Sequence, residues 1–534
     1  MDSERRTDVE VPGPHDLSRW TIAIASGLAV ITALLIYQPY SARPFDMRDF
    51  SEFVPLLKAH DSWAKQFNNM TAYYATRGRA NLIPYAAIVV KWNLFGWQSE
   101  WWQILRFAQM CVLVATAFAV IRRFGAGTLG AMVGASLFIV SGSAAHGWVR
   151  LTMAEVVGTQ LLLVGLLIAF DVQRAAKWSR HAFALAVIVA ALVLAKEMFV
   201  AAIPLLLIVA LGWQADDSLR FPNPSPRNIA VFTACSIAAV ATIIPVGLVA
   251  LHAPAGAYTS TFGTEGVPWF RPVVWLTGAL TPYLVVAWRN PTWALVQLLV
   301  FVALLVVGWK ALLQDGSLRR NYRAVFALLA LHVLVGAVLY LPWPVYQPFY
   351  AMPFMIAPAA AVGLSVTGIR RLPLPSMVFK ALVTTGWAFV LCSAAMQAID
   401  YRRATDAEQR FNAELVAAIA ARRATVDSLV VANKRPLRGT RAWQGFGATI
   451  GRYGTAMSYD MPPVQDEDCT TAQQRRATGG ATILVLRNGK TCDPMSQPDT
   501  VIVRRFVQFD WDRLRSVNDS LFAELYRGLG RVGP

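Results

Sequence analysis

Long apolar runs, separated by short polar stretches, follow one another from about residue 20 to residue 398. About 20 apolar residues form a helix of roughly 30 Å, which matches the hydrocarbon core of a bilayer. The pattern therefore predicts an all-α polytopic membrane bundle of about eleven transmembrane helices. We expect the spans near residues 20–37, 100–121, 126–145, 151–170, 181–197, 198–213, 229–251, 291–312, 324–341, 350–369 and 377–398.

The two ends of the chain have a different pattern. Residues 1–19 are polar and contain two prolines, so we expect a disordered leader before a transmembrane domain over 20–399. Residues 400–534 have the composition of a soluble protein, with helical periodicity at 404–423 and 512–527. Short strand-like runs lie at 428–432, 481–486 and 500–503, whereas 433–480 resembles a long loop. The tail is therefore predicted to be a small α+β domain.

Composition supports the membrane class. Of the 534 residues, 56% are hydrophobic and only 15% are charged, which excludes an ordinary soluble protein. The formal net charge is +17, and many of the Lys and Arg residues lie in short loops between apolar runs. That distribution orients a membrane protein and does not require nucleic acid. Membrane lipids and a lipid phosphate are the expected anionic partners.

The basic loops also predict an orientation. They fall on one side of the predicted bundle, which is then cytoplasmic, if 273–288 is a surface or re-entrant segment and the first helix is an uncleaved anchor. The N-terminus is then cytoplasmic, and the loops 38–99 and 252–290 face outward together with the tail. This fits an integral protein of the inner (cytoplasmic) membrane. The basic positions are Arg122, Arg123, Arg174, Lys177, Arg180, Arg220, Arg227, Lys310, Arg319, Arg320, Arg323, Arg370 and Arg371.

Two cysteines, Cys469 and Cys492, lie in the polar tail, whereas the other three lie within predicted spans. In an oxidising compartment this pair suits one disulfide, and two separate thiols are the alternative. The six histidines are scattered and form no ligand pair, so no metal site is predicted. No cofactor is predicted either, and the sequence leaves open whether a divalent metal assists.

The first outer loop opens with carboxylates close to the membrane exit. Asp46, Asp49 and Glu52 follow the first predicted span within a few residues. A carboxylate near the headgroup plane becomes a better base because the low dielectric raises its pKa. A solvated turn that caps a helix over 50–57 explains the same residues equally well.

The same loop carries two arginines before an amphipathic run at 85–97. Arg77 and Arg79 precede the segment Asn81-Leu-Ile-Pro84. Guanidinium groups bind phosphate bidentately, and a helix lying in the interface would hold them at headgroup depth. Plain anchoring to anionic lipid is the alternative.

Charged residues at the ends of spans are a third candidate cluster. Glu155 lies about one turn into the fourth predicted span, and Lys196 and Glu197 lie between the fifth and the sixth. Intramembrane charges usually face a cavity or one another. The sequence leaves open a structural ion pair of Lys196 with Glu155 or Glu197, and a role in binding a lipid phosphate or sugar. His332, alone in an apolar run, is predicted to be a hydrogen-bonded packing residue.

Several of these motifs, in this order, resemble a known family. The sequence Phe45-Asp46-Met-Arg-Asp49-Phe, then Gly78-Arg79 with Pro84, and a helix ending Leu94-Phe95-Gly96, looks like the polytopic GT-C glycosyltransferases that use polyprenyl-phosphate sugars. Ala154-Glu155 and Leu-Ala-Lys196-Glu197-Met-Phe resemble two further motifs of that family. The chain departs from the pattern at 345–350, where many relatives carry an Arg-Tyr pair, and in the separation of Asp46 from Asp49.

The resemblance implies a GT-C-like fold over about residues 20–400 and inverting sugar transfer on the outer face. The donor would be a polyprenyl-phosphate sugar, and the acceptor a lipid, glycan or protein. Asp49 would be the catalytic base, with Asp46 in support. Arg79 would stabilise the leaving phosphate, helped by Arg77, Lys196 or Arg271. A lipid or solute transporter and a non-enzymatic assembly subunit remain alternatives, although the sequence shows neither repeats nor paired broken helices.

Overall fold

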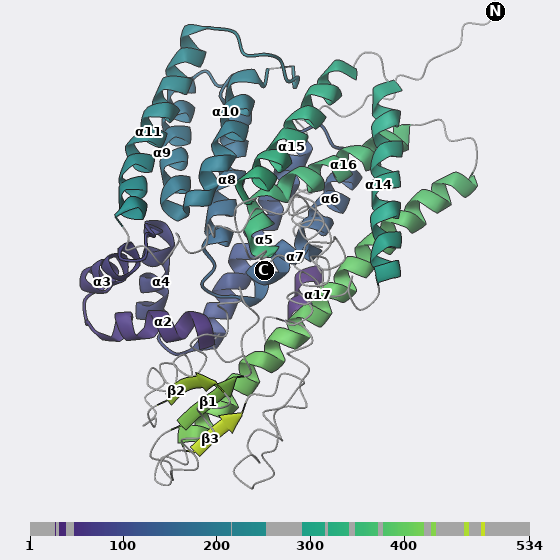
Figure 1. The fold of residues 1–534 in the computed structure, drawn as a ribbon. Helices are drawn as coiled ribbons and strands as arrows, with labels where there is room; N and C mark the ends of the chain where they lie inside the picture. The colour runs from purple at the N-terminus through teal and green to yellow at the C-terminus, as the bar shows by residue number, and fades with distance from the viewer. Residues whose placement is uncertain are drawn as a thin grey trace, which may run out of the picture.

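The computed structural model describes residues 27, 31–38, 47–214, 216–252, 291–314, 319–340, 348–371, 377–420, 429–433, 464–468 and 482–485. Within them the protein is mostly helical, with one small sheet (Figure 1). The predicted leader, the segment 273–288, Asp46, Arg271, Cys469 and Cys492 lie outside these residues. So do the predicted strand at 500–503 and the predicted helix at 512–527.

Helices occupy the apolar runs in which spans were predicted. Five of the described helices are long and apolar enough to cross a bilayer, or six if a bent pair counts as one span. These properties make the chain an integral membrane protein, whereas the total of about eleven spans stays a prediction. The five are α5 (Ser99–Arg123), α8 (Ala154–Asp171), α9 (Trp178–Ala195), α11 (Pro226–Leu251) and α15 (Arg319–Tyr340).

The other elements of the bundle are a bent pair of helices, two 3₁₀ segments and three further helices. The bent pair consists of α6 and α7, which meet at 54°. This break at Ser141 was not predicted from the sequence. The other elements are α6 (Thr128–Val140), α7 (Gly142–Val149), the 3₁₀ segment η1 (Glu197–Ala202), α10 (Ile203–Gly212), α14 (Pro291–Gln314), the 3₁₀ segment η2 (Pro348–Phe354) and α16 (Ile356–Arg371).

Small residues let α6 and α16 pack closely. A Cβ atom added at Gly130 would lie 2.1 Å from the backbone oxygen of Gly363, and one at Gly134 would lie 2.3 Å from that of Ala359. Only glycine fits at such distances, and close backbone approach is how helices associate within a bilayer. This contact fixes the central part of the bundle.

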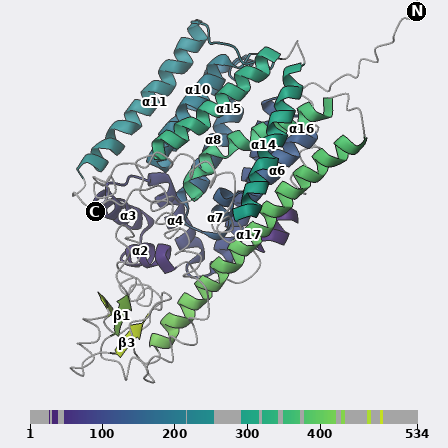
Figure 2. The same cartoon turned by 45° about the vertical axis from the view of Figure 1, so that its right-hand side comes forward.

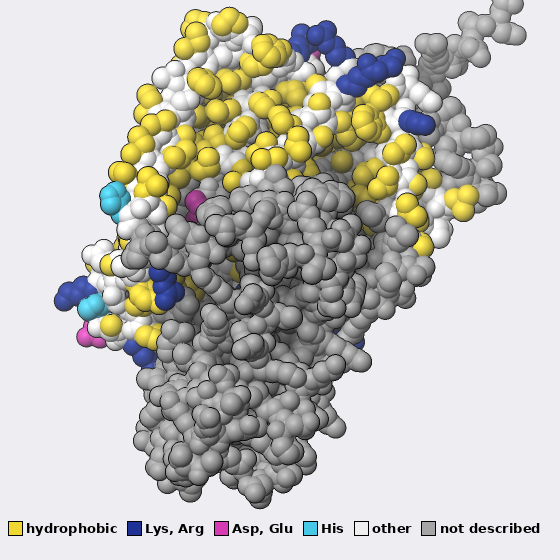
Figure 3. All heavy atoms as spheres, viewed as in Figure 1, with side chains coloured by type: hydrophobic (Ala, Val, Ile, Leu, Met, Phe, Trp, Pro, Cys, Tyr) yellow, Lys and Arg dark blue, Asp and Glu magenta, His cyan; other side chains and the backbone are white. Residues whose placement is uncertain are grey.

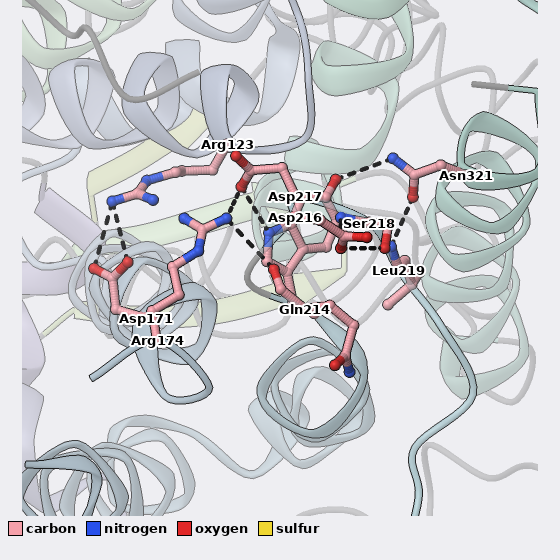
Figure 4. A network of polar contacts seen from close by, with 10 residues as sticks. Arg123, Asp171, Arg174, Gln214, Asp216, Asp217, Ser218, Leu219 and Asn321 are labelled. Atoms are coloured by element: carbon pink, nitrogen blue, oxygen red, sulfur yellow. Dashed lines mark hydrogen bonds and ion pairs between the residues drawn. The ribbon is translucent and has the colours of Figure 1, made fainter. Parts of the chain in front are cut away.

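One end of the bundle, here called the basic end, gathers the basic loops. Arg123 at the end of α5 pairs with Asp171 at the end of α8 at 3.1 Å. Arg174 pairs with Asp217 in the α10–α11 connection, and the backbone N–H of Leu219 donates to Asn321 of α15 at 2.7 Å (Figure 4). In Figure 3, Lys and Arg side chains gather along the upper edge of the visible face, above a broad hydrophobic band.

The basic end also includes contacts between elements that are far apart in the sequence. The N–H of Gly127 donates to Thr367 at 2.8 Å, which places the end of α16 beside the start of α6. The orientation of this end relative to the membrane stays a prediction. The opposite end, here called the site end, contains the start of α8, the end of α9 and the segment η2.

Three short helices form a layer at the site end. They are α2 (Met47–Lys58), α3 (Trp63–Ala75) and α4 (Leu82–Phe95), and they lie beneath α8, α9 and α11 in Figure 1. Side-chain amides tie the layer together, because Gln66 donates to the carbonyl of Leu57 and Asn69 to that of Leu56, both at 3.0 Å. At about 1.5 Å per residue none of the three is long enough to cross a bilayer.

The last span and the first helix of the tail are one element. The helix α17 (Met377–Ala420) runs through 44 residues without a break, so the predicted separation of a span at 377–398 from a helix at 404–423 is wrong. It extends past the bundle toward the sheet in both views (Figures 1 and 2). Arg402 of α17 donates to the carbonyl of Ile36 at 3.0 Å, which attaches the helix to the end of the first apolar run.

The sheet has three parallel strands in the order β2-β1-β3. The strands β1 (Leu429–Asn433) and β3 (Thr482–Val485) match two predicted strands. The strand β2 (Val464–Asp468) lies inside the stretch predicted to be a long loop, so that prediction is wrong there. The described residues of the tail thus combine part of a helix with a sheet.

Candidate functional site

A buried ion pair at the site end joins α8 to α9. The helix α9 ends at Ala195, and the backbone of Lys196 is extended (φ −171°, ψ 142°) before η1 begins. Lys196 donates from Nζ to Oε1 of Glu155 in the first turn of α8. The side chain of Glu155 is 2% exposed and that of Lys196 is 16% exposed. Of the alternatives left open by the sequence, the structure has the pair of Lys196 with Glu155.

The position of each partner stabilises its charge. Glu155 lies at the N-terminus of α8, where the helix dipole favours a carboxylate. Removing one partner of a buried pair typically costs about 3–5 kcal/mol, because the other charge is left without compensation. Glu155 and Lys196 therefore have a structural role whatever else they do.

Tyr350 completes this cluster. The Nζ atom of Lys196 lies 4.6 Å from the centroid of the Tyr350 ring, in cation–π contact. Tyr350 belongs to η2, which His332 of α15 holds through a 3.2 Å hydrogen bond to the carbonyl of Pro353. His332 is thus the hydrogen-bonded packing residue that the sequence predicts.

The sequence did not identify Tyr350 as a site residue. It lies at 345–350, the stretch in which the chain departs from the family pattern. A tyrosine after a proline at the start of a span is a weak local signal. Its contact with Lys196 depends on how α9 and η2 pack, which one sequence does not reveal.

The broken span α6–α7 also contributes to the site end. The hydroxyl of Ser141 accepts a hydrogen bond from the N–H of Ala144 at 3.2 Å and so caps α7. The helix α7 packs against η2. Tyr37 donates to the carbonyl of Ile139 at 2.7 Å and stacks on Trp148 at 4.8 Å. The end of the first apolar run is therefore attached beside the break.

Asp49, the predicted catalytic base, belongs to the layer of short helices. Asp49 lies in the first turn of α2, which begins at Met47, three residues earlier than the helix predicted over 50–57. Phe50, the next residue, is buried, and its ring meets that of Trp102 edge-on at 5.4 Å. This contact fixes the backbone of α2 at Asp49 against α5. Asp46, predicted to support it, lies outside the described residues.

The two arginines predicted to bind phosphate lie in the turn between α3 and α4. Gly78 has a φ of 73°, which reverses the chain, and the N–H of Arg79 donates to the carbonyl of Tyr74 at 3.0 Å. Arg77 donates to the hydroxyl of Tyr73 and lies over its ring at 4.3 Å. Arg79 is exposed. The turn thus orients one arginine against an aromatic ring and leaves the other accessible.

The predicted site residues fall into two groups. Glu155 and Lys196 are in contact, and Glu197 follows Lys196 in η1. Arg77, Arg79 and Asp49 belong to the layer α2–α4, whose helix α4 packs against α9. Among the described residues, no three His, Cys, Asp or Glu side chains are grouped as a metal ion requires.

No protein-family model matches the chain, and no curated protein matches it in sequence. One similar solved structure is the arabinofuranosyltransferase AftD from Mycobacteria, with 14% identity over 93% of this chain and a TM-score of 0.48. The chain spans 37% of the length of AftD. Another is ArnT from Cupriavidus metallidurans bound to undecaprenyl phosphate, with 11% identity, 88% of this chain, 97% of that chain and a TM-score of 0.48. These similarities assign no function to the present chain.

Proposed function

We propose that the chain is a membrane glycosyltransferase that moves a hexosyl or pentosyl group from a polyprenyl-phosphate donor to a lipid, glycan or protein acceptor. The observation that carries the proposal is the buried pair Glu155–Lys196, with Tyr350, at the same end of the bundle as the α2–α4 layer. Charged side chains at the depth of lipid headgroups suit a substrate that carries both a lipid and a phosphate. The order of the family-like motifs gives further support.

The proposed reaction needs one base and one group of cations. Asp49 removes the proton of an acceptor hydroxyl while its oxygen forms a bond to the anomeric carbon of the sugar. The bond from that carbon to the phosphate oxygen breaks, and the configuration inverts. Arg79 stabilises the charge on the departing polyprenyl phosphate, assisted by Arg77, Lys196 or Arg271. Asp46 supports the base, while Glu155 and Glu197 keep Lys196 in position.

The proposed orientation follows from the distribution of charge. The basic end faces the cytoplasm, together with the N-terminus. The site end and the C-terminal domain then face outward from the inner (cytoplasmic) membrane. In this orientation the donor lipid would lie among the helices, with its phosphate at the level of Lys196.

Donor binding in detergent tests the proposal. Arg79→Lys keeps the charge but loses the bidentate geometry of the guanidinium group, so we expect weaker binding of a polyprenyl-phosphate sugar with thermal stability retained. Arg180→Lys, an exposed change at the basic end, is the matched control and should bind normally. If Arg79→Ala keeps full donor affinity, Arg79 does not belong to the site.

A transporter is the second candidate, because the broken span α6–α7 is a feature that transporters share. Detergent solution separates the two functions, since it has no second compartment. A glycosyltransferase forms labelled product there, with or without a chelator according to its need for a metal. Movement of donor lipid across proteoliposomes without product would instead identify a transporter. If neither labelled product nor lipid movement is observed, the non-enzymatic assembly subunit is the remaining alternative.

A further inference from the structure

A buried lysine lies at the elbow between α4 and α5. Lys91 is 8% exposed, although it belongs to a short helix at the site end. Its Nζ atom lies 5.7 Å from the centroid of the Trp102 ring, and it forms no hydrogen bond or ion pair with the residues that the structure describes. Burying an ammonium group without an anionic partner is costly. An anion beside it would remove that cost.

A second cation lies close to the first. Arg106 follows Trp102 by one turn of α5 and is 2% exposed. It donates from Nη2 to the carbonyl of Leu151 at 2.6 Å, which fixes the guanidinium group beside the connection from α7 to α8. Burial, together with the charge of Arg106, lowers the pKa of Lys91 to about 7. When Lys91 is protonated the two positive charges repel each other, and one anion that contacts both side chains would relieve this repulsion.

The position of the elbow indicates which anion it suits. The side chains of Leu94, Trp101 and Ile104, which follow Lys91 along the chain, are large, apolar and exposed. Such residues at the end of a span lie where a bilayer meets water. Phosphate groups of lipids are the abundant anions at that depth. The four-carbon stem of a lysine lets its ammonium group turn toward a headgroup.

We propose that Lys91 and Arg106 form a phosphate-binding site for a membrane lipid at the α4–α5 elbow. The site does not include Lys196 or Arg79, and it does not rest on the proposed sugar transfer. A phosphate monoester or diester at the elbow accepts hydrogen bonds from both cations. Because Arg106 also contacts Leu151, just before α8, the lipid would brace the elbow against the helix that carries Glu155.

The test uses the full chain, freed of lipid in neutral detergent, and measures thermal stabilisation by added ligands. Phosphatidylglycerol is compared with diacylglycerol, polyprenyl phosphate with polyprenol, and inorganic phosphate with chloride. We expect stabilisation by phosphatidylglycerol, by polyprenyl phosphate or by both, and not by their uncharged counterparts. Equal stabilisation by inorganic phosphate at the same concentration would overturn the assignment to a lipid.

The variants locate the binding. Lys91→Met removes the charge and keeps the length of the side chain, so lipid binding should weaken at least about tenfold, while Lys91→Arg should retain it. Lys65→Met, at an exposed lysine of α3, is the matched control and should bind as the unchanged protein does. Without lipid, Lys91→Met should be at least as stable as the unchanged protein, because a buried charge is gone. Unchanged lipid binding, or a clear loss of stability without lipid, would overturn the proposal.

Discussion

The carboxylate of Asp49 is the residue on which the proposed chemistry depends most. It belongs to the first turn of α2, whose backbone is fixed because Phe50 packs against Trp102. Asp49→Asn keeps the size of the side chain but is a far poorer base, so sugar transfer should fall by about 10²–10⁴-fold with donor binding little changed. Asp46→Asn should cost much less. The measurement is the rate of labelled-sugar transfer in detergent.

A matched carboxylate controls that experiment. Glu100 is exposed in the first turn of α5, and Glu100→Gln should transfer sugar normally. If Asp46→Asn is inactive and Asp49→Asn is active, Asp46 is the base and Asp49 is the supporting residue. Full activity in both variants would show that this loop is not the catalytic centre.

The pair Glu155–Lys196 makes a prediction about stability. Glu155→Gln and Lys196→Met should each destabilise the protein by about 3–5 kcal/mol, because each leaves one buried charge without its partner. The double variant should recover much of that loss. A double-mutant cycle on thermal unfolding in detergent gives the interaction energy. Additive losses would contradict the ion pair as the reason for the burial of both residues.

Lys91 makes a prediction about pH. Its pKa is lowered to about 7 by burial and by Arg106, whereas a lysine in an unfolded chain titrates near 10.4. Between these values the unfolded chain binds one proton more, so stability rises with pH by up to about 1.4 kcal/mol per unit. Below about pH 7 both states are protonated and this contribution to the slope disappears.

Thermal unfolding of lipid-free protein from pH 7 to 9.5 measures that slope. The stability of Lys91→Met should rise less steeply with pH than that of the unchanged protein, because the variant lacks the titration of Lys91. The difference between the two curves is the contribution of Lys91. Parallel curves would mean that Lys91 is charged in the folded protein.

At the scale of elements, the length of the apolar runs predicted where the helices lie, but it did not predict all of their breaks. The break at Lys196 lies within two residues of the predicted boundary between 197 and 198. The break at Ser141 had a signal in Ser141-Gly142-Ser143, since small polar residues permit a sharp kink. The strand β2 reads Val-Gln-Asp-Glu-Asp, without the β-branched alternation typical of strands. It lies at the edge of the sheet, where charged residues are tolerated.

The same limits apply to the candidate site. Glu155 and Lys196 were found because charge is rare in spans, but their pairing was one of several possibilities. Tyr350 and Lys91 are common residue types in common settings. Their importance comes from contacts across helices, with Lys196 and with Trp102, and no local pattern encodes those contacts.

At the scale of the whole molecule, the orientation makes a further prediction. With the N-terminus in the cytoplasm and about eleven spans, a reporter fused after Pro534 should report the outside of the membrane. If Cys469 and Cys492 form a disulfide, Cys469 should resist alkylation until a reductant is added. A reporter that is active in the cytoplasm would overturn the count of spans and the assignment of both outer loops.

The helix α17 has no joint where it leaves the bundle. Its 44 residues extend over about 66 Å, roughly twice the thickness of a hydrocarbon core. Because the helix is unbroken, tilting the half beyond the bundle also tilts the half that packs against α14, α6 and α7. Arg402, which donates a hydrogen bond to the carbonyl of Ile36, lies between these two halves. Binding to the half of α17 beyond the bundle can thus shift α6 and α7 around the break at Ser141, with no change in the backbone conformation of α17.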